Sequence, residues 1–140
     1  MKKISIGFTG TRKGMTREQM KALLKVLQDI NFAEAHHGDC VGADEQFHRL
    51  VRIFFPDVVI VIHPPKNPKL RAFCKGDVIM PEKDYLERNR DIVKNCDLLI
   101  ACPKEFHEVL RSGTWATVRY ARKAGKPIII IFPDGNIKKE

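Results

Sequence analysis

The sequence predicts an α/β fold, a Rossmann-like three-layer sandwich with a mainly parallel sheet. Short apolar runs alternate with amphipathic stretches of helical period from end to end, and neither a repeat nor a linker interrupts them. One run, Val58–His63, is almost wholly β-branched, which is typical of a strand covered on both faces. The chain has 140 residues, about the commonest size for one domain, so we expect a single domain over 1–140.

The first half of the chain is expected to hold three strands and two helices. The strands are Ile4–Phe8, Ala33–His37 and Val58–His63. The first helix follows Thr16, because Thr16 and Gln19 have the spacing of a capping box. Its buried stripe consists of Met20, Leu23, Leu24, Leu27 and Ile30. The second helix is expected over about 43–55, with these residues facing inward: Phe47, Leu50, Val51 and Phe54.

Residues 64–81 interrupt the alternation with prolines, a glycine and several cations. A loop this long inside a compact domain is usually functional or mobile. Its basic residues are Lys66, Lys69, Arg71 and Lys75. Either they close over an anionic ligand as a lid, or they form an exposed charged loop, and both interpretations stay open.

The second half continues the same alternation. A helix is expected over Glu82–Asn95, with Tyr85, Leu86, Ile92 and Val93 on its apolar side. Three further elements follow, namely a strand Asp97–Ala101, a helix Thr114–Ala124 and a strand Ile128–Phe132. The tail, Asn136–Glu140, is expected to be frayed.

Composition excludes some classes of protein and favours others. The chain is 44% hydrophobic and 30% charged, as globular proteins are, and no apolar run approaches the roughly 20 residues that span a bilayer. The apolar start is too short for a signal peptide, so we expect a cytoplasmic protein without a membrane partner. A net charge of +8 favours anionic partners. The four cysteines show no metal-binding spacing, so we expect free thiols, no metal site and no cofactor.

In a fold of this kind, ligands bind beyond the carboxyl ends of the strands. The first loop there is Thr9-Gly10-Thr11-Arg12. Its glycine allows close approach, its hydroxyls can donate to phosphate oxygens, and Arg12 offers a bidentate cation. We therefore interpret it as a ligand-binding loop, the alternative being a plain strand-to-helix turn.

The second loop holds Gly38, Asp39, Gly42 and Asp44 at the start of the second helix. Backbone amides there should point into the site. The two aspartates either hold ribose hydroxyls or a base amino group, or they serve the turn and the helix dipole. Nearby histidines, among them His36, His37 and His48, lack a third ligand at sensible spacing, so no metal is expected.

The third loop is Ser112-Gly113-Thr114, which opens the last long helix. A glycine, two hydroxyls and a helix amino terminus together make an anion site. Ser and Thr are also preferred as helix caps, and both roles can hold at once.

With these loops in view, the chain resembles the SLOG superfamily, which contains the Lonely-guy phosphoribohydrolases and the DNA-processing protein of natural transformation. The resemblance covers Gly7 to Phe132. Its motifs are Phe8–Arg12, His37–Asp44, Glu87–Ile92 and Ser112–Thr114, and the small stand-alone members are most similar in size. It implies a nucleotide-binding Rossmann-like domain, and it adds Arg88 and Asn89 to the ligand-binding residues.

One departure from the family bears on catalysis. Lonely-guy enzymes carry a glutamate after glycine-threonine where this chain has Thr117, whereas Arg88 matches their catalytic arginine. Cleavage of an N-glycosidic bond needs a group that activates water or stabilises an oxocarbenium-like centre. Asp39, Asp44 or Glu87 would have to replace that carboxylate.

Three functions remain open. The first is a binding module for a nucleotide or nucleotide-derived ligand, the second an enzyme that hydrolyses an N-glycosidic bond of a nucleotide, and the third a binder of single-stranded nucleic acid. The third has little support, because the chain is 8% aromatic and shows no basic-aromatic interleaving. A homo-oligomer formed through Trp115, Leu110 and Val118 is a further hypothesis, conditional on exposure of the tryptophan.

Overall fold

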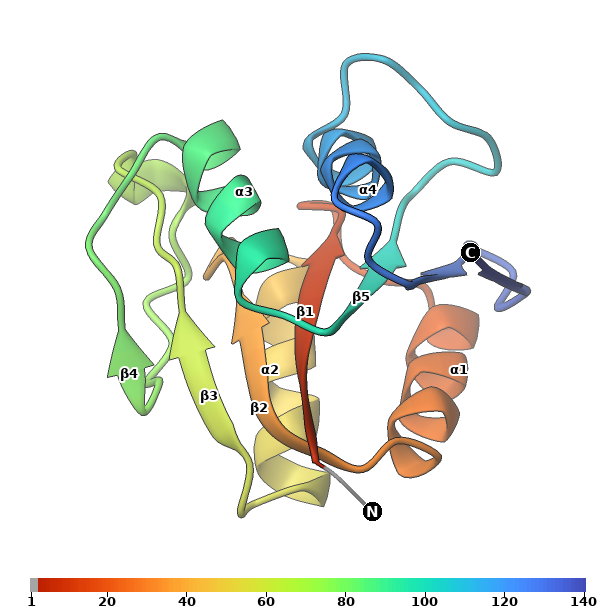
Figure 1. Ribbon diagram of the computed structural model, residues 1–140, viewed down its shortest axis with the longest axis horizontal. Coiled ribbons are helices and arrows are strands. Elements are labelled where there is room, and N and C mark those ends of the chain that lie inside the picture. The colour runs from red at the N-terminus through yellow and green to blue at the C-terminus, as the bar shows by residue number, and fades with distance from the viewer. Residues whose placement is uncertain (1–2) are drawn as a thin grey trace.

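A computed structural model describes residues 3–140 and shows one sheet of seven strands between two layers of helices (Figure 1). The strands are β1 (Ile4–Gly10), β2 (Phe32–His37), β3 (Val59–Ile62), β4 (Val78–Ile79), β5 (Leu98–Cys102), β6 (Ile128–Ile131) and β7 (Ile137–Lys139). The helices are α1 (Arg17–Gln28), α2 (Ala43–Phe54), the short 3₁₀ turn η1 (Pro68–Leu70), α3 (Tyr85–Lys94) and α4 (Gly113–Lys123). The predicted Rossmann-like sandwich is therefore confirmed.

The strand order places the edge at which a ligand is expected. The order is β4-β3-β2-β1-β5-β6-β7, and every neighbouring pair is parallel except β6 with β7. The chain moves outward from β1 to β4, then returns past β1 to β5. The carboxyl ends of β1 and β5 thus form a topological switch point, where connecting loops diverge and leave a crevice.

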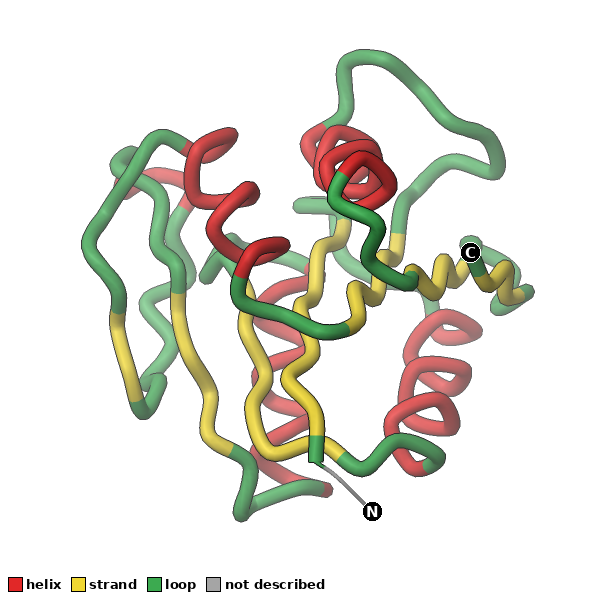
Figure 2. The backbone as a smooth tube through the Cα atoms, in the orientation of Figure 1, coloured by secondary structure: helices red, strands yellow, loops and turns green. Residues whose placement is uncertain are grey.

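Each face of the sheet carries its own hydrophobic core. One core packs α1 and α2 against the sheet, and it contains the stacked rings of Phe8 and Phe47, whose centroids are 4.3 Å apart. The other packs α4 and the end of α3 against β5 and β6, with Val93, Trp115 and Val118 buried. Figure 2 shows the loops that gather at one edge of this sandwich.

The capping box at the start of α1 is confirmed. The Thr16 side chain accepts a hydrogen bond from the Gln19 amide, and the Gln19 side chain accepts one from the Thr16 amide. Gln19 also donates to the carbonyls of Pro103 and Ile131, at 2.7 and 2.9 Å. One buried polar side chain thus both starts the helix and ties it to the loop ends of two strands.

Three expectations about burial were wrong. Phe54, at the end of α2, is 53% exposed, and Tyr85 and Leu86 are exposed in the first turn of α3. Helical spacing shows which residues share a face but not how much of that face a neighbouring element covers. Trp115 and Val118 are buried whereas Leu110 is exposed, so the condition on which the oligomer hypothesis depended is not met.

Two short strands were missed. The tail is not frayed, because β7 pairs antiparallel with β6 and Arg122 binds Glu140 at 2.6 and 2.8 Å. Within 64–81, β4 adds a parallel edge next to β3, held by the Asp77 carboxylate, which accepts from the Ile60 amide and from Arg52. Elements of two or three residues carry too little periodicity to be recognised in a sequence.

Among residues 3–140, no helix combines the length and the apolar character needed to cross a bilayer.

Candidate functional site

A cavity of about 600 Å³ opens at the carboxyl ends of β1 and β5. Four parts of the chain supply most of its wall: the loop after β1, the loop after β2, the first turns of α3, and the long connection from β5 to α4. Of the ligand-binding residues expected from the sequence, ten line it: Thr9, Gly10, Thr11, Arg12, Asp44, Arg88, Asn89, Ser112, Gly113 and Thr114. This volume suits a small organic ligand.

The cavity wall is strongly cationic. Its basic residues are Arg12, Lys13, Arg88, Lys104 and Arg111, whereas its acidic residues are Asp44 and Glu105. Such an excess of positive side chains around a concave site concentrates anions there.

Arg88 is the most deeply placed of these cations, with 6% of its surface exposed. Its guanidinium lies against the backbone of Gly38 so closely that a β-carbon built there would be 1.3 Å from Nη1. Nη2 donates to the Cys40 sulfur at 2.9 Å, and Nε has no hydrogen-bond partner among residues 3–140. Its one carboxylate neighbour within 4 Å among the described residues is Asp44, at 3.9 Å, which is too long for a hydrogen bond.

Asp44 lies in the first turn of α2 and is 5% exposed. Its Oδ2 accepts a hydrogen bond from the Cys40 amide at 3.2 Å, and its Oδ1 is buried without a partner. Burial raises the pKa of this carboxyl to about 6, and the charge of Arg88 limits the rise. The cavity therefore contains a carboxylate that is ionised at neutral pH and only half satisfied.

Asp39, by contrast, is not among the described residues that line the cavity. It is fully buried with a φ of 55°, and its carboxylate accepts from Arg71 Nε and from the Cys74 amide, both at 2.9 Å. Of the two roles considered for Asp39, the contacts match the stabilisation of a turn, here one that fastens the 64–81 segment. Gly38 and Gly42 also lie outside the cavity lining among the described residues.

The two glycines of this loop serve packing. Gly38 makes room for Arg88, and Gly42 begins α2 with a φ of 92°, where a β-carbon would be 2.3 Å from the Arg12 carbonyl oxygen. A side chain at either position would displace a residue that lines the cavity. Glu87, the remaining catalytic candidate, is exposed on α3 and is not part of the lining.

The third loop caps α4 as expected. Ser112 Oγ accepts from the Trp115 amide at 3.2 Å, and Gly113 and Thr114 line the cavity next to it. Thr117, which stands where the Lonely-guy enzymes that the sequence resembles carry a glutamate, is fully buried and donates to the Gly113 carbonyl at 2.8 Å. It has no free group to offer a ligand.

Sequence reasoning missed Glu105 and its neighbours Lys104 and Arg111. They belong to the ten-residue connection Pro103–Ser112 between β5 and the first residue of α4. The Glu105 carboxylate accepts from the Trp115 indole nitrogen at 3.0 Å, which also explains why that tryptophan is buried. The length of this loop at the carboxyl edge was the available signal.

The 64–81 segment touches the cavity through Leu70. Arg71 is engaged by Asp39 and Glu82, and none of the segment's four cations lies in the lining that the described residues form. A lid that closes with these cations stays a prediction.

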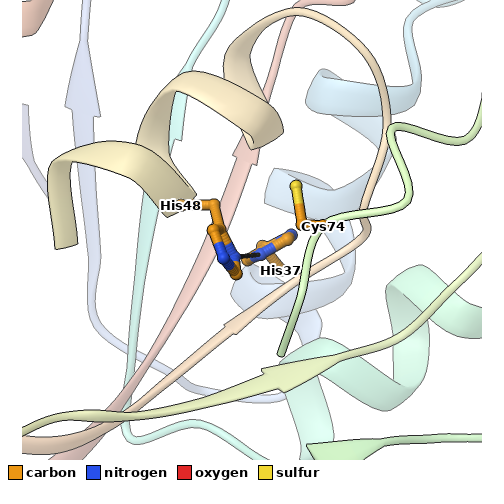
Figure 3. Close-up of side chains that lie close together, drawn as sticks. All are labelled: His37, His48 and Cys74. Carbon is orange, nitrogen blue, oxygen red and sulfur yellow. Dashed lines mark hydrogen bonds between the residues drawn. The ribbon is translucent and has the colours of Figure 1, made fainter. Parts of the chain in front are cut away.

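His37, His48 and Cys74 converge beside this site (Figure 3), with their ligand atoms within 4.8 Å of one another. Cys74 is the third ligand that sequence spacing did not reveal, since it comes from a loop 26 residues beyond His48. His37 Nδ1 accepts from the Asp39 amide at 2.9 Å, so its proton lies on Nε2, which is 2.9 Å from His48 Nδ1. Burial holds the pKa of His37 far below its usual value and raises that of Cys74 to about 12.

This donor set does not fit a metal ion as it stands. A metal needs a thiolate and unprotonated ring nitrogens, and a ligating histidine usually donates its other N–H to an acceptor. Here the inward nitrogen of His37 carries the proton and its outward nitrogen faces a donor. Within the cluster, His37 and His48 are hydrogen-bonded and so link β2 to α2, whereas Cys74 is tied to Asp39 through its backbone amide.

Fold and site together define a Rossmann-like α/β protein with a cationic, ligand-sized cavity at the switch point of its sheet. Among solved structures, the chain is similar to a molybdenum cofactor binding protein from the phototrophic bacterium Rippkaea orientalis, with 22% identity, 94% of this chain and 78% of that one covered, and a TM-score of 0.69. It is also similar to the protein TM1055, with 18% identity, 91% and 72% covered, and a TM-score of 0.64. No protein-family model and no curated protein matches the sequence. At these identities the likeness establishes the fold.

Proposed function

We propose that this protein binds a phosphate-bearing, nucleotide-like ligand in the cavity at the carboxyl ends of β1 and β5. The observation that carries this proposal is Arg88, a buried guanidinium with no close carboxylate partner in a cavity that four further cations line.

The energetic argument concerns the anion that Arg88 lacks. A buried cation is costly unless an anion pairs with it, and Asp44 at 3.9 Å compensates Arg88 only in part. A bound phosphate would supply the missing charge and accept the unused hydrogen bond of Nε. The amide groups at the start of α4 and the hydroxyl of Thr114 lie on the same cavity and favour an anion there as well.

Resemblance supports the proposal in a second way. All four motifs that resemble the SLOG superfamily contribute residues to one cavity, among them Arg12, Asp44, Arg88 and Thr114. We propose that the chain is a small member of that superfamily. One structural neighbour is described as binding the molybdenum cofactor, so that ligand belongs among those tested.

The test is a thermal-shift screen against nucleoside mono-, di- and triphosphates, ADP-ribose, cyclic nucleotides, the molybdenum cofactor and short single-stranded DNA. A ligand present at a hundred times its dissociation constant stabilises the folded state by about 2.7 kcal/mol. Arg12→Ala should remove the shift. Arg49→Ala, which removes the same charge from an exposed position on α2, should keep it.

Two results would contradict the proposal. The first is no shift from any phosphate compound, and the second is an equal loss in Arg12→Ala and Arg49→Ala. Shifts from single-stranded DNA alone, weakening as salt rises, would favour nucleic-acid binding instead.

A second candidate function is hydrolysis of the ligand's N-glycosidic bond, and Asp44 is the observation that favours it. A cavity carboxyl with a pKa of about 6 suits acid–base chemistry near neutral pH, and Glu105 places a second carboxylate on the same wall. The measurement is release of free base from bound nucleotide, followed by chromatography. Turnover that Asp44→Asn abolishes would establish an enzyme, and binding without release would leave a binding module.

A further inference from the structure

The Asp44 carboxylate has an acceptor that no group of the described chain satisfies. Oδ2 accepts from the Cys40 amide, and Oδ1 is buried and makes no hydrogen bond of ordinary geometry with the described residues, although the Gly38 backbone lies near enough to lower the pKa of the carboxyl. An unsatisfied buried acceptor costs roughly 1–3 kcal/mol, more for a charged group, so such atoms are rare away from sites that await a partner. Asp44 also lines the cavity, which is where a partner would arrive.

The chemistry of the partner follows from the charge of this group. A phosphate dianion carries no proton to donate and is repelled by a carboxylate. The part of the ligand that meets Asp44 must therefore donate a hydrogen bond and carry no negative charge.

The position of Asp44 beside Arg88 restricts the type of donor group further. Asp44 Oδ2 lies 3.9 Å from the guanidinium that the proposed function assigns to the phosphate. In a nucleotide the sugar lies next to the phosphate, and the base lies a full sugar ring further away. A donor this close to the phosphate is a sugar hydroxyl.

We propose that Asp44 accepts a hydrogen bond from a ribose hydroxyl, and that the site thereby selects ribonucleotides over deoxyribonucleotides. This inference rests on the proposed function, because it needs a bound phosphate ester of a sugar. Under this inference, Arg88 binds the phosphate and Asp44 binds the sugar of the same ligand.

The experiment is titration calorimetry at pH 7.5, above the pKa of Asp44, with the four ribonucleoside 5′-monophosphates and their 2′-deoxy and 3′-deoxy counterparts. Ribose 5-phosphate and inorganic phosphate serve as probes without a base. The variants are Asp44→Asn and Glu45→Gln. Glu45 is the next residue of α2 and lies outside the cavity lining, so its substitution matches the change in charge.

In the unaltered protein, a ribonucleotide should bind at least about tenfold more tightly than one of its deoxy counterparts, because a hydrogen bond to a charged group is lost. Asp44→Asn should reduce this ratio to below about threefold, while inorganic phosphate binds as well as before or better. Glu45→Gln should retain the ratio. A merely structural role for Asp44 would instead weaken every ligand alike and leave the ratio unchanged.

Three outcomes would overturn the inference. A ratio near one in the unaltered protein, with phosphate compounds still bound, refutes sugar selection and leaves the proposed function standing. A change in Asp44→Asn confined to the preference among the four bases assigns Asp44 to the base. Absence of binding by every phosphate compound refutes the proposed function itself. If Asp44→Asn does not fold, Asp44→Glu, which moves the carboxylate outward, should lower the same ratio.

Discussion

The guanidinium of Arg88 occupies the space that a side chain at Gly38 would fill, with Nη1 1.3 Å and Cζ 2.4 Å from the position of a built β-carbon. Gly38 and Arg88 are 50 positions apart in the sequence. The guanidinium packs directly against the glycine backbone, and it can do so because the glycine has no side chain. This contact leads to the first prediction.

Gly38→Ala should displace Arg88 and weaken binding of a phosphate ligand about tenfold or more, comparable to Arg88→Ala. Gly38 has no left-handed backbone conformation, so the cost is steric. The measurement is a double-mutant cycle by calorimetry. Gly38→Ala should cost little in the Arg88→Ala background, and additive losses would show that the glycine acts independently of the arginine.

Thr114→Val and Ser112→Ala should separate ligand binding from helix capping. Thr114 has no side-chain hydrogen bond within the described chain, so valine should leave the free energy of unfolding within about 0.5 kcal/mol and weaken phosphate binding. Ser112 caps α4, so Ser112→Ala should cost about 1 kcal/mol of stability. Urea unfolding and calorimetry measure the two effects. If Ser112→Ala and Thr114→Val lose affinity equally and Ser112→Ala loses no stability, the capping role of Ser112 is contradicted.

Asp44→Asn should make the free protein more stable above pH 6. The pKa of this carboxyl is raised from 3.8 to about 6, so its contribution to stability is present at low pH and is lost as the pH rises through about 6. The variant's advantage should grow between pH 4 and 6 and reach up to about 3 kcal/mol, with Glu45→Gln as the control. Urea unfolding at pH 4.5 and 7.5 provides the comparison. If Asp44→Asn is no more stable than the unaltered protein at either pH, the attraction between Asp44 and Arg88 offsets the cost of burying the carboxylate.

The paired histidines at the ends of β2 and β3 should lower stability in acid. His36 Nδ1 lies 2.8 Å from His63 Nε2, and burial lowers the pKa of His63 from 6.5 to about 4. The unfolded chain therefore binds the proton first, and the free energy of unfolding should fall by up to about 3 kcal/mol as the pH drops from 6.5 to 4.

His63→Gln should flatten that part of the pH profile, because glutamine can hydrogen-bond without titrating. His107→Gln, at an exposed position, should leave the profile unchanged. Because Asp44 titrates with the opposite sign in an overlapping range, each variant is compared with the unaltered protein at every pH. An unchanged slope in His63→Gln would assign the acid sensitivity to other groups.

Much of this molecule followed from local physical chemistry. The period of apolar residues identified the type of each long element, and the Thr16–Gln19 spacing located the start of α1. The parallel-sheet rule placed the ligand edge, and most of the residues proposed from the first and third loops line the cavity there. Such features depend on neighbours a few positions away, so a sequence displays them.

Contacts between distant segments could not be predicted in this way. Asp39 and Asp44 are five positions apart in one glycine-bracketed loop, and sequence reasoning treated them alike. Arg71 and Cys74, which come from more than 30 positions further on, bind the Asp39 carboxylate, whereas Asp44 lines the cavity. For the same reason, the sequence could not predict that Cys74 lies next to His37 and His48, or that Glu105 binds Trp115.

The sequence by itself determined the elements, their order and the edge at which they present loops, because helical and strand periodicity are properties of adjacent residues. Only the tertiary structure decided which charges meet. It left Arg88 without a close anion, Asp44 with an unused oxygen and Asp39 fully paired, because the partner of a buried charge is set by packing between segments far apart in the chain.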